Sequence, residues 1–191
     1  MEEINIRPAT PADAPCIARG IIMAIGEEIA SSLAGGPGRR PLVDRLFTEL
    51  ALMDKSQYSY LNSHVAATPD GRVAGIVVAY DGARLHDLRR AFTAKAAEIL
   101  GLTIDPDTMH DETSPDEVYL DSLAVFPEFR GLGIARRLIA CAADKALAIG
   151  KPLGLLCEPE NHPAAALYAS VGFTPRGQRP FAGVMMNHLR L

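Results

Sequence analysis

The sequence predicts a single α/β or α+β domain, and three observations support this prediction. Residues 118–149 combine an apolar, β-rich run, a glycine-containing turn and a long segment of helical periodicity. Residues 152–171 repeat the order of strand followed by helix, and residues 64–80 have the pattern of a hairpin. The chain has 191 residues, 48% of them hydrophobic, and no internal repeat. We therefore expect one domain over residues 1–191.

The first expected elements are a short strand and an amphipathic helix. Residues 4–7 alternate before Pro8, and residues 10–13 combine a threonine cap with a proline and an acid in the first turn. The apolar face of this helix consists of Ile17, Ile21, Ile22, Ile25 and Ile29. Glu27 and Glu28 lie near its expected far end, where carboxylates oppose the helix dipole. They form either a solvated helix end or an anionic site for a cationic substrate.

A breaker-rich loop over residues 35–41 separates this helix from a second one, expected over residues 42–53. A hairpin follows, with strands at 64–67 and 73–80 and a turn at 69–72. Residues 74–79 are apolar throughout, which predicts a strand buried at the centre of a sheet.

Residues 81–117 interrupt the alternation of elements. Residues 84–100 have helical periodicity, whereas residues 105–117 are acidic and contain prolines, which predicts an exposed loop. Four residues of this loop are of metal-ligating types: Asp107, His110, Asp111 and Glu112. Their spacing matches no metal motif, so we expect a solvated loop and no metal.

The stretch from residue 118 onward contains the most informative local pattern. Pro127 ends the expected strand, and the turn from Arg130 to Ala135 contains two glycines directly before a helix. Glycines permit positive φ, and a helix start presents free N–H groups, so the turn is either a phosphate cradle or a plain connection. Further along, a strand over 152–157, a helix over 164–171 and closing strands at 173–176 and 184–191 complete the chain.

Bulk properties exclude several classes of function. The net charge of −4 and the isoelectric point near 5.7 give no general attraction to nucleic acid or to an anionic membrane. Cys16, Cys141 and Cys157 are widely spaced, which suits core residues in a reducing compartment. There is no basic leader and no apolar run that could span a bilayer, so we expect a cytoplasmic protein.

Two motifs together resemble the signatures of the GCN5-related N-acetyltransferase (GNAT) superfamily. The first is Arg130-x-x-Gly133-x-Ala135, in which alanine occupies the third small position. The second is Asn161 followed by Ala164, Leu167, Tyr168, Gly172 and Phe173. The resemblance is specific over residues 118–175 and implies a mixed, mostly antiparallel sheet, splayed between its fourth and fifth strands and flanked by helices.

The resemblance also implies an acetyl-CoA-dependent N-acetyltransferase. Residues 118–191 would form the acyl-CoA half, and residues 1–117 the acceptor half, with residues 81–117 as an insertion that covers the acceptor site or forms a dimer contact. The strand backbone would pair with pantetheine, the turn would hold the pyrophosphate, and Asn161 would anchor pantetheine further along. The implied acyl-CoA-binding residues are Leu123, Ala124, Val125, Arg130, Gly131, Leu132, Gly133, Ile134, Ala135, Arg136, Asn161, Ala164 and Tyr168.

The implied chemistry needs an oxyanion donor, an acid and a base. The N–H of Leu123 is the expected donor to the oxyanion, and Tyr168, next to the thioester sulfur, is the expected acid. The base stays open among Asp121, Glu158, and Glu27 or Glu28, which also form the expected acceptor-binding set. A charge inside an apolar strand is costly unless it is paired or functional, and this favours Asp121.

The leading hypothesis is acetylation of a primary amine of a small molecule. The alternatives are acetylation of a peptide or protein amine, and an acyl-CoA sensor without turnover. A P-loop or Rossmann nucleotide binder does not fit, because no Lys-Ser/Thr follows the glycines and the G-x-G-x-x-G spacing is absent.

Overall fold

The computed structural model describes residues 3–191, and within them seven strands form one sheet in the order β1-β2-β3-β4-β5-β7-β6. The strands are β1 (Asn5–Pro8), β2 (Ser63–Ala67), β3 (Val73–Asp81), β4 (Val118–Val125), β5 (Leu153–Cys157), β6 (Thr174–Phe181) and β7 (Val184–Arg190). The helices are α1 (Ala14–Ala34), α2 (Arg40–Leu52), α3 (Leu85–Leu100), α4 (Ile134–Ala148) and α5 (His162–Ser170). The predicted α/β fold with a mostly antiparallel sheet is confirmed, and β6 is longer than the sequence indicated.

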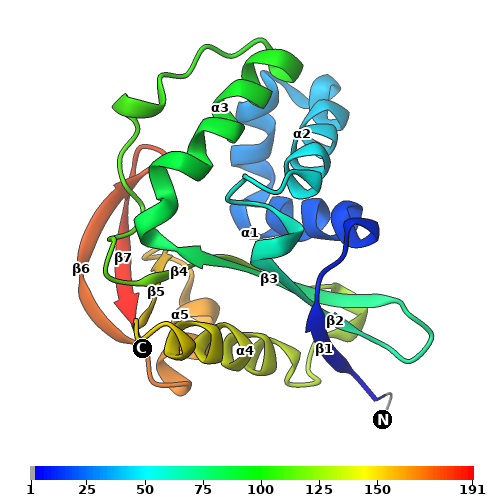
Figure 1. Cartoon of the computed structure of the whole chain (residues 1–191), viewed down its shortest axis with the longest axis vertical. Coiled ribbons are helices and arrows are strands. Elements are labelled where there is room, and N and C mark those ends of the chain that lie inside the picture. The colour runs from blue at the N-terminus through cyan, green and yellow to red at the C-terminus, as the bar shows by residue number, and fades with distance from the viewer. Residues whose placement is uncertain (1–2) are drawn as a thin grey trace.

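The helices cover the two faces of the sheet in separate groups (Figure 1). α1, α2 and α3 lie over one face, and α4 and α5 lie under the other. We call these the α1 face and the α4 face. The predicted hairpin is β2 and β3, and β3 is central because it pairs with both β2 and β4. Its buried residues therefore pack on both layers of helices.

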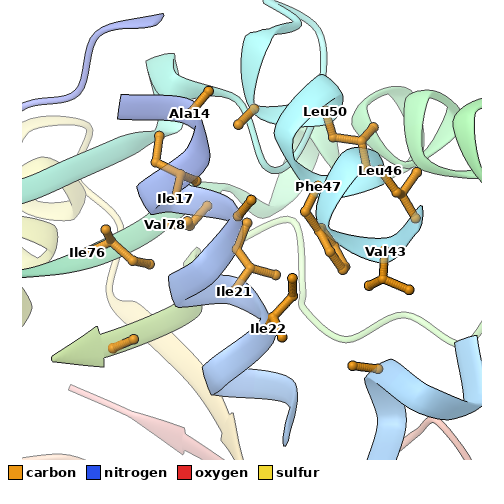
Figure 2. Packing of buried hydrophobic residues seen from close by; sticks show 14 of the residues in the cluster. Ala14, Ile17, Ile21, Ile22, Val43, Leu46, Phe47, Leu50, Ile76 and Val78 are labelled. Atoms are coloured by element: carbon orange, nitrogen blue, oxygen red, sulfur yellow. The ribbon is translucent and has the colours of Figure 1, made fainter. Parts of the chain in front are cut away.

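The core on the α1 face fixes α1 and α2 against β3 (Figure 2). The side chains labelled there are Ala14, Ile17, Ile21 and Ile22 of α1, Val43, Leu46, Phe47 and Leu50 of α2, and Ile76 and Val78 of β3. Each fully buried aliphatic side chain contributes about 1.5–3 kcal/mol. A β-carbon at Gly20 would lie 2.2 Å from Cγ1 of Ile76, so glycine is what lets α1 lie this close to the sheet.

The helix α1 has a break that no sequence pattern indicated. Gly26 has φ 83° and ψ 156°, a backbone conformation outside the helical region. Glu27 and Glu28 therefore begin a second helical segment, and the expectation that they oppose a helix dipole is wrong. They lie at a helix start, where negative charge is favourable.

The expectation that residues 105–117 form an exposed loop is wrong for the second half of that segment. Glu112, Thr113 and Glu117 are buried, and Glu117 has no exposed surface at all. Its carboxylate accepts hydrogen bonds from the Thr113 hydroxyl (2.8 Å) and from Nε of Arg190 (3.0 Å). The acidic composition of this segment predicted that it is exposed to solvent, but partners distant in sequence compensate the buried charges in the interior.

Strands β4 and β5 separate as the resemblance implied. They pair in parallel only at Val118 with Leu153 and at Tyr119 with Gly154. Beyond Tyr119 the edge of β4 that faces β5 has no strand partner in the described part of the chain, and this opens the sheet at its centre. Among residues 3–191 no helix is long and apolar enough to cross a membrane. Within the same range, no group of three His, Cys, Asp or Glu residues could hold a metal ion.

Candidate active site

The gap between β4 and β5 opens into two adjoining hollows. The larger has a volume of about 280 Å³ and the smaller about 230 Å³. Both are lined by Met23, Leu123, Ala164 and Tyr168, so they meet at these four residues. The smaller extends to Arg130 and Ala135, at the turn before α4, and the larger extends to Asp121 and Glu158.

A β-bulge in β4 places Asp121 at the larger hollow. Ser122 pairs with Val78 and Leu120 pairs with Ala79, so Asp121 is an extra residue without a partner on β3. Bulges often re-aim a side chain next to an active site. The bulge also explains how a carboxylate fits inside an otherwise apolar strand, because Asp121 occupies no position in the regular ladder.

The backbone of β4 offers hydrogen-bonding groups to the gap. The N–H of Phe126 bonds to the carbonyl of Ala74 on β3, and antiparallel ladders alternate direction from residue to residue. The peptide groups of Ala124 therefore face β3, and those of Leu123 and Val125 face the gap. The main chain of Ala124 thus points away from the gap and its side chain is buried in the core of the α1 face, although Ala124 does line the smaller hollow.

The turn before α4 has the geometry of an anion cradle. Gly131 and Gly133 have φ of 78° and 73°, and a β-carbon on either would lie in open space. The first main-chain bond into α4 joins the N–H of Arg137 to the carbonyl of Gly133 (3.4 Å). The N–H groups of residues 134–136 thus have no partner inside the helix, and the positive end of its dipole lies here.

All three arginines of this turn are exposed, and each donates to a main-chain carbonyl. Arg137 donates to the carbonyl of Ile4 (2.7 Å) and so fastens the start of the chain to α4. Arg130 and Arg136 lie beside the free N–H groups, and they donate to the carbonyls of Val125 at the gap (3.3 Å) and of Ser170 (3.3 Å). Free N–H groups, open space at the glycines and two exposed arginines fit a pyrophosphate, and the adjoining unpaired strand edge fits an extended pantetheine arm.

The Asp121 carboxyl is suited to exchange protons near neutral pH. Burial, and next the charge of Glu112, raise its pKa to about 7, while hydrogen bonds from Ser122 and Gln57 oppose that shift. The Ser122 hydroxyl donates to Oδ1 of Asp121 at 2.8 Å. A carboxyl group with a pKa of about 7 is half ionised near neutral pH. A general base is most effective when its pKa lies near the pH at which the enzyme works.

Tyr168 lies where the two hollows meet. Its ring packs edge-on against Phe173, with 5.5 Å between ring centroids. Burial, with a smaller contribution from Cys157, raises the pKa of the phenol to about 12. Tyr168 therefore holds its proton at neutral pH and can donate it.

Of the remaining predicted site residues, some line the larger hollow and others lie outside it. Glu158 and Ala164 line the larger hollow, as does Asn161, whose Oδ1 also caps α5 by accepting from the N–H of Ala164 (3.1 Å). Glu27 and Glu28 are not among the lining residues. Glu27 is exposed and pairs with Nε of Arg40 on α2 at 3.2 Å, so the structure does not bring these two acids to the site.

Several lining residues had no sequence signal. They are apolar residues of α1, aromatic residues near Asp121 and the hairpin of β6 and β7: Met23, Ala24, Ile25, Ile29, Tyr58, Tyr119, Phe181, Ala182, Val184 and Met186. Each looks like an ordinary core or hairpin residue in its own segment. Only Tyr119 could have been singled out from the sequence, because it lies two residues before Asp121, the charged residue of a buried strand.

Comparison with known proteins identifies the family. The profile of the acetyltransferase (GNAT) family matches residues 39–173, which is more than half of the chain. The chain therefore belongs to the GNAT family of acetyltransferases. Among curated proteins, no sequence matches this chain.

Solved structures agree with this assignment. An acetyltransferase crystal structure is 30% identical and has a TM-score of 0.76, with 97% of each chain covered. An N-acetyltransferase from Staphylococcus aureus Mu50 is 23% identical with a TM-score of 0.79, over 98% of this chain and 100% of that one. A histone acetyltransferase HPA2 and related acetyltransferase from Corynebacterium glutamicum is 20% identical with a TM-score of 0.69, over 100% and 96%. The last two show the fold alone.

Proposed function

We propose that this acetyltransferase transfers the acetyl group of acetyl-CoA to the primary amine of a small molecule by direct attack. The observation that carries the proposal is the meeting of Asp121, Leu123 and Tyr168 at adjoining hollows on an open strand edge. Acetyl-CoA supplies the activated acetyl group. The turn and α4 start would hold its pyrophosphate, and the gap-facing peptide groups of Leu123 and Val125 would pair with its pantetheine arm.

Three groups of the chain then divide the chemistry. Asp121 accepts a proton from the ammonium, directly or through a water, and so makes the nitrogen nucleophilic. The N–H of Leu123 donates to the oxygen on which negative charge develops as the nitrogen attacks. As the C–S bond breaks, the Tyr168 hydroxyl gives its proton to the departing sulfur, and the excess proton on the newly bonded nitrogen then passes to the phenolate. General acid–base groups of this kind typically contribute 10²–10⁴-fold in rate.

The larger hollow supports a cationic amine with an apolar body. Its side chains from α1 and from the β6–β7 hairpin are mostly apolar, and Asp121 and Glu158 supply two carboxylates. Among the described residues that line it, none is Lys, Arg or His, so a carboxylate or phosphate on the acceptor would find no cationic partner there. We therefore propose aliphatic or aromatic monoamines before amino acids.

An acceptor screen monitored by the free thiol of released CoA tests this proposal. The informative pairs are phenethylamine against phenylalanine, in which a carboxylate replaces a hydrogen, and hexylamine against 6-aminohexanoate, in which a carboxylate replaces the terminal methyl group. We expect the amine of each pair to be acetylated at least tenfold faster, because an unpaired buried charge costs several kcal/mol.

Other outcomes of the screen point to the other functions. Turnover confined to peptide amines would move the function to protein or peptide acetylation. Binding of acetyl-CoA in calorimetry without release of CoA by any amine would indicate a sensor, and absence of acetyl-CoA binding would contradict the proposal itself.

A further inference from the structure

Met23 of α1 lies where the two hollows of the candidate active site meet. Four of the described residues line both hollows, and the other three, Leu123, Ala164 and Tyr168, belong to β4 and α5. Met23 is therefore what α1 contributes to this junction. It also packs against the cores of both faces of the sheet, so its side chain extends from α1 into the opening between β4 and β5.

The neighbours of Met23 in α1 hold its backbone in place. Ile21 and Ile22, directly before it, are buried in the core of the α1 face. One turn earlier, the absence of a side chain at Gly20 lets the helix lie against Ile76 of β3. Because interiors are close-packed, the helix cannot move away from the junction without opening this core. Only the side chain of Met23 can adjust to what binds there.

The other three residues of the junction leave its α1 side to Met23. The side chain of Leu123 packs against the core of the α4 face, and Ala164 carries only a methyl group. The ring of Tyr168 is fixed edge-on against Phe173. Met23 is half-buried, and a methionine side chain is long and unbranched, which suits it to fill an irregular gap. The length of this side chain therefore sets the room at the junction.

We propose that Met23 is a specificity-determining residue for the acyl donor, whose side chain limits the donor to short acyl chains such as acetyl. The inference rests on the proposed function, in which the thioester lies between the N–H of Leu123 and the hydroxyl of Tyr168. The pantetheine arm would occupy the smaller hollow up to that point. An acyl chain longer than acetyl would have to displace the Met23 side chain in order to pass the junction.

The chemical step does not distinguish one acyl chain from another. With any acyl-CoA, the C–N bond forms at the carbonyl carbon and the C–S bond breaks. The sulfur takes the proton of Tyr168, and the two protons that the ammonium loses pass to Asp121 and to the phenolate. Selectivity must therefore come from the room around the chain, and one methylene in an apolar pocket changes kcat/KM by about 10–200-fold.

Donor preference in Met23→Ala tests the proposal. Release of CoA from acetyl-CoA and from butyryl-CoA is measured with phenethylamine as acceptor, and the two kcat/KM values are compared. We expect the wild type to prefer acetyl-CoA by roughly a hundredfold, because butyryl is longer by two methylenes. Met23→Ala removes Cγ, Sδ and Cε from the junction, so it is expected to raise the ratio of butyryl to acetyl transfer by about tenfold or more.

Two further methionines provide matched controls. Met186 of β7 is half-buried and lines the larger hollow, but it is not among the described residues of the smaller one. Met186→Ala is therefore expected to change the preference among amines and to leave the donor ratio in place. Met53 is half-buried against the core of the α1 face and is not among the residues described at either hollow. Met53→Ala shows what loss of packing alone does.

A merely structural role of Met23 would lower the melting temperature, as in Met53→Ala, without moving the donor ratio. If Met23→Ala does not fold, Met23→Val shortens the same side chain by less and is expected to give a smaller rise in the ratio. An unchanged donor ratio in the folded variant would overturn the proposal, and so would equal use of the two donors by the wild type.

A binding measurement separates this inference from the proposed function. Calorimetry without an amine is expected to show that the wild type binds butyryl-CoA about tenfold or more weakly than acetyl-CoA, and that Met23→Ala binds both alike. If no amine releases CoA, the proposed function fails, and these affinities still decide whether Met23 limits the acyl chain. Equal affinities in the wild type would contradict the limit even where acetyl transfer occurs.

Discussion

The two halves of the site are built in different ways. The proposed acyl-CoA half depends on main-chain groups, which are the free N–H groups at the start of α4 and the open edge of β4. The proposed acceptor half depends on side chains from α1, from Tyr58, from β4 and from the β6–β7 hairpin. Main-chain recognition constrains a short, continuous stretch of sequence, and side-chain recognition spreads over segments that have no local signature.

The largest effect that tests this contrast is expected from Gly133→Glu. The substitution places a side chain at φ 73° and a negative charge in front of the free N–H groups, so binding of acetyl-CoA should be lost in calorimetry. Gly71→Glu is the matched control, because Gly71 has φ 87° and equally open space but lies in the β2–β3 turn. Retained binding in Gly133→Glu would refute the main-chain cradle.

The next largest effect is expected from Asp121→Asn. Removal of the base should lower kcat by roughly 10²–10⁴-fold while calorimetry finds acetyl-CoA affinity unchanged, because the cradle is untouched. Glu27→Gln is the control, since Glu27 is exposed and pairs with Arg40 outside the hollow. Equal losses in both variants would show that the acceptor half has been assigned to the wrong carboxylate.

A smaller effect is expected from Tyr168→Phe. A thiolate leaves more readily than an alkoxide, so loss of the phenol should lower kcat by only about tenfold to a hundredfold, at the low end of general acid catalysis. Acetyl-CoA affinity should hold, because the ring and its packing on Phe173 remain. Tyr60→Phe removes an exposed hydroxyl that bonds to Asp54 and serves as control. An unchanged rate would remove Tyr168 from the mechanism.

The smallest effect concerns stability. The pKa of the Asp121 carboxyl rises on folding from 3.8 to about 7. Between these pH values the unfolded chain has lost the carboxyl proton while the folded chain keeps it, so the free energy of unfolding falls as pH rises. Above pH 7 this decrease in the free energy of unfolding no longer changes with pH. Asp121→Asn should thus raise the melting temperature at pH 8 by roughly 2 °C or more, and by nothing at pH 4. Thermal unfolding followed by circular dichroism checks this, and an equal change at both pH values would contradict the shifted pKa.

The sequence predicted the secondary structure of the proposed acyl-CoA half in detail. Strand β4, the turn with Gly131 and Gly133, and α4 are where periodicity and glycines placed them, because each depends on neighbours in sequence. The refinement concerns Ala124, whose peptide groups face β3. Only the observed register of the ladder could reveal that.

The acceptor half was predictable only in part. Asp121 was favoured as a costly charge in a buried strand, and Glu27 and Glu28 ranked next until the break at Gly26 and the ion pair with Arg40 placed them elsewhere. Glu112 looked like a solvated acid, because its partners lie 23 residues away at Arg89 and 55 residues away at Gln57. Pairings at such separations leave no trace in local composition.

The bulge in β4 separates chemistry from packing. Tyr119 and Ser122 pair with Tyr80 and Val78 on the α1 face, and Leu120 and Leu123 pair with Ala79 and Val77 on the α4 face. The alternation of these core residues is complete when Asp121 is left out of the count. Position 121 is therefore an insertion in the strand that a directed-evolution library can vary while every core residue of the strand keeps its face, and under the proposed function such variation would change the acceptor.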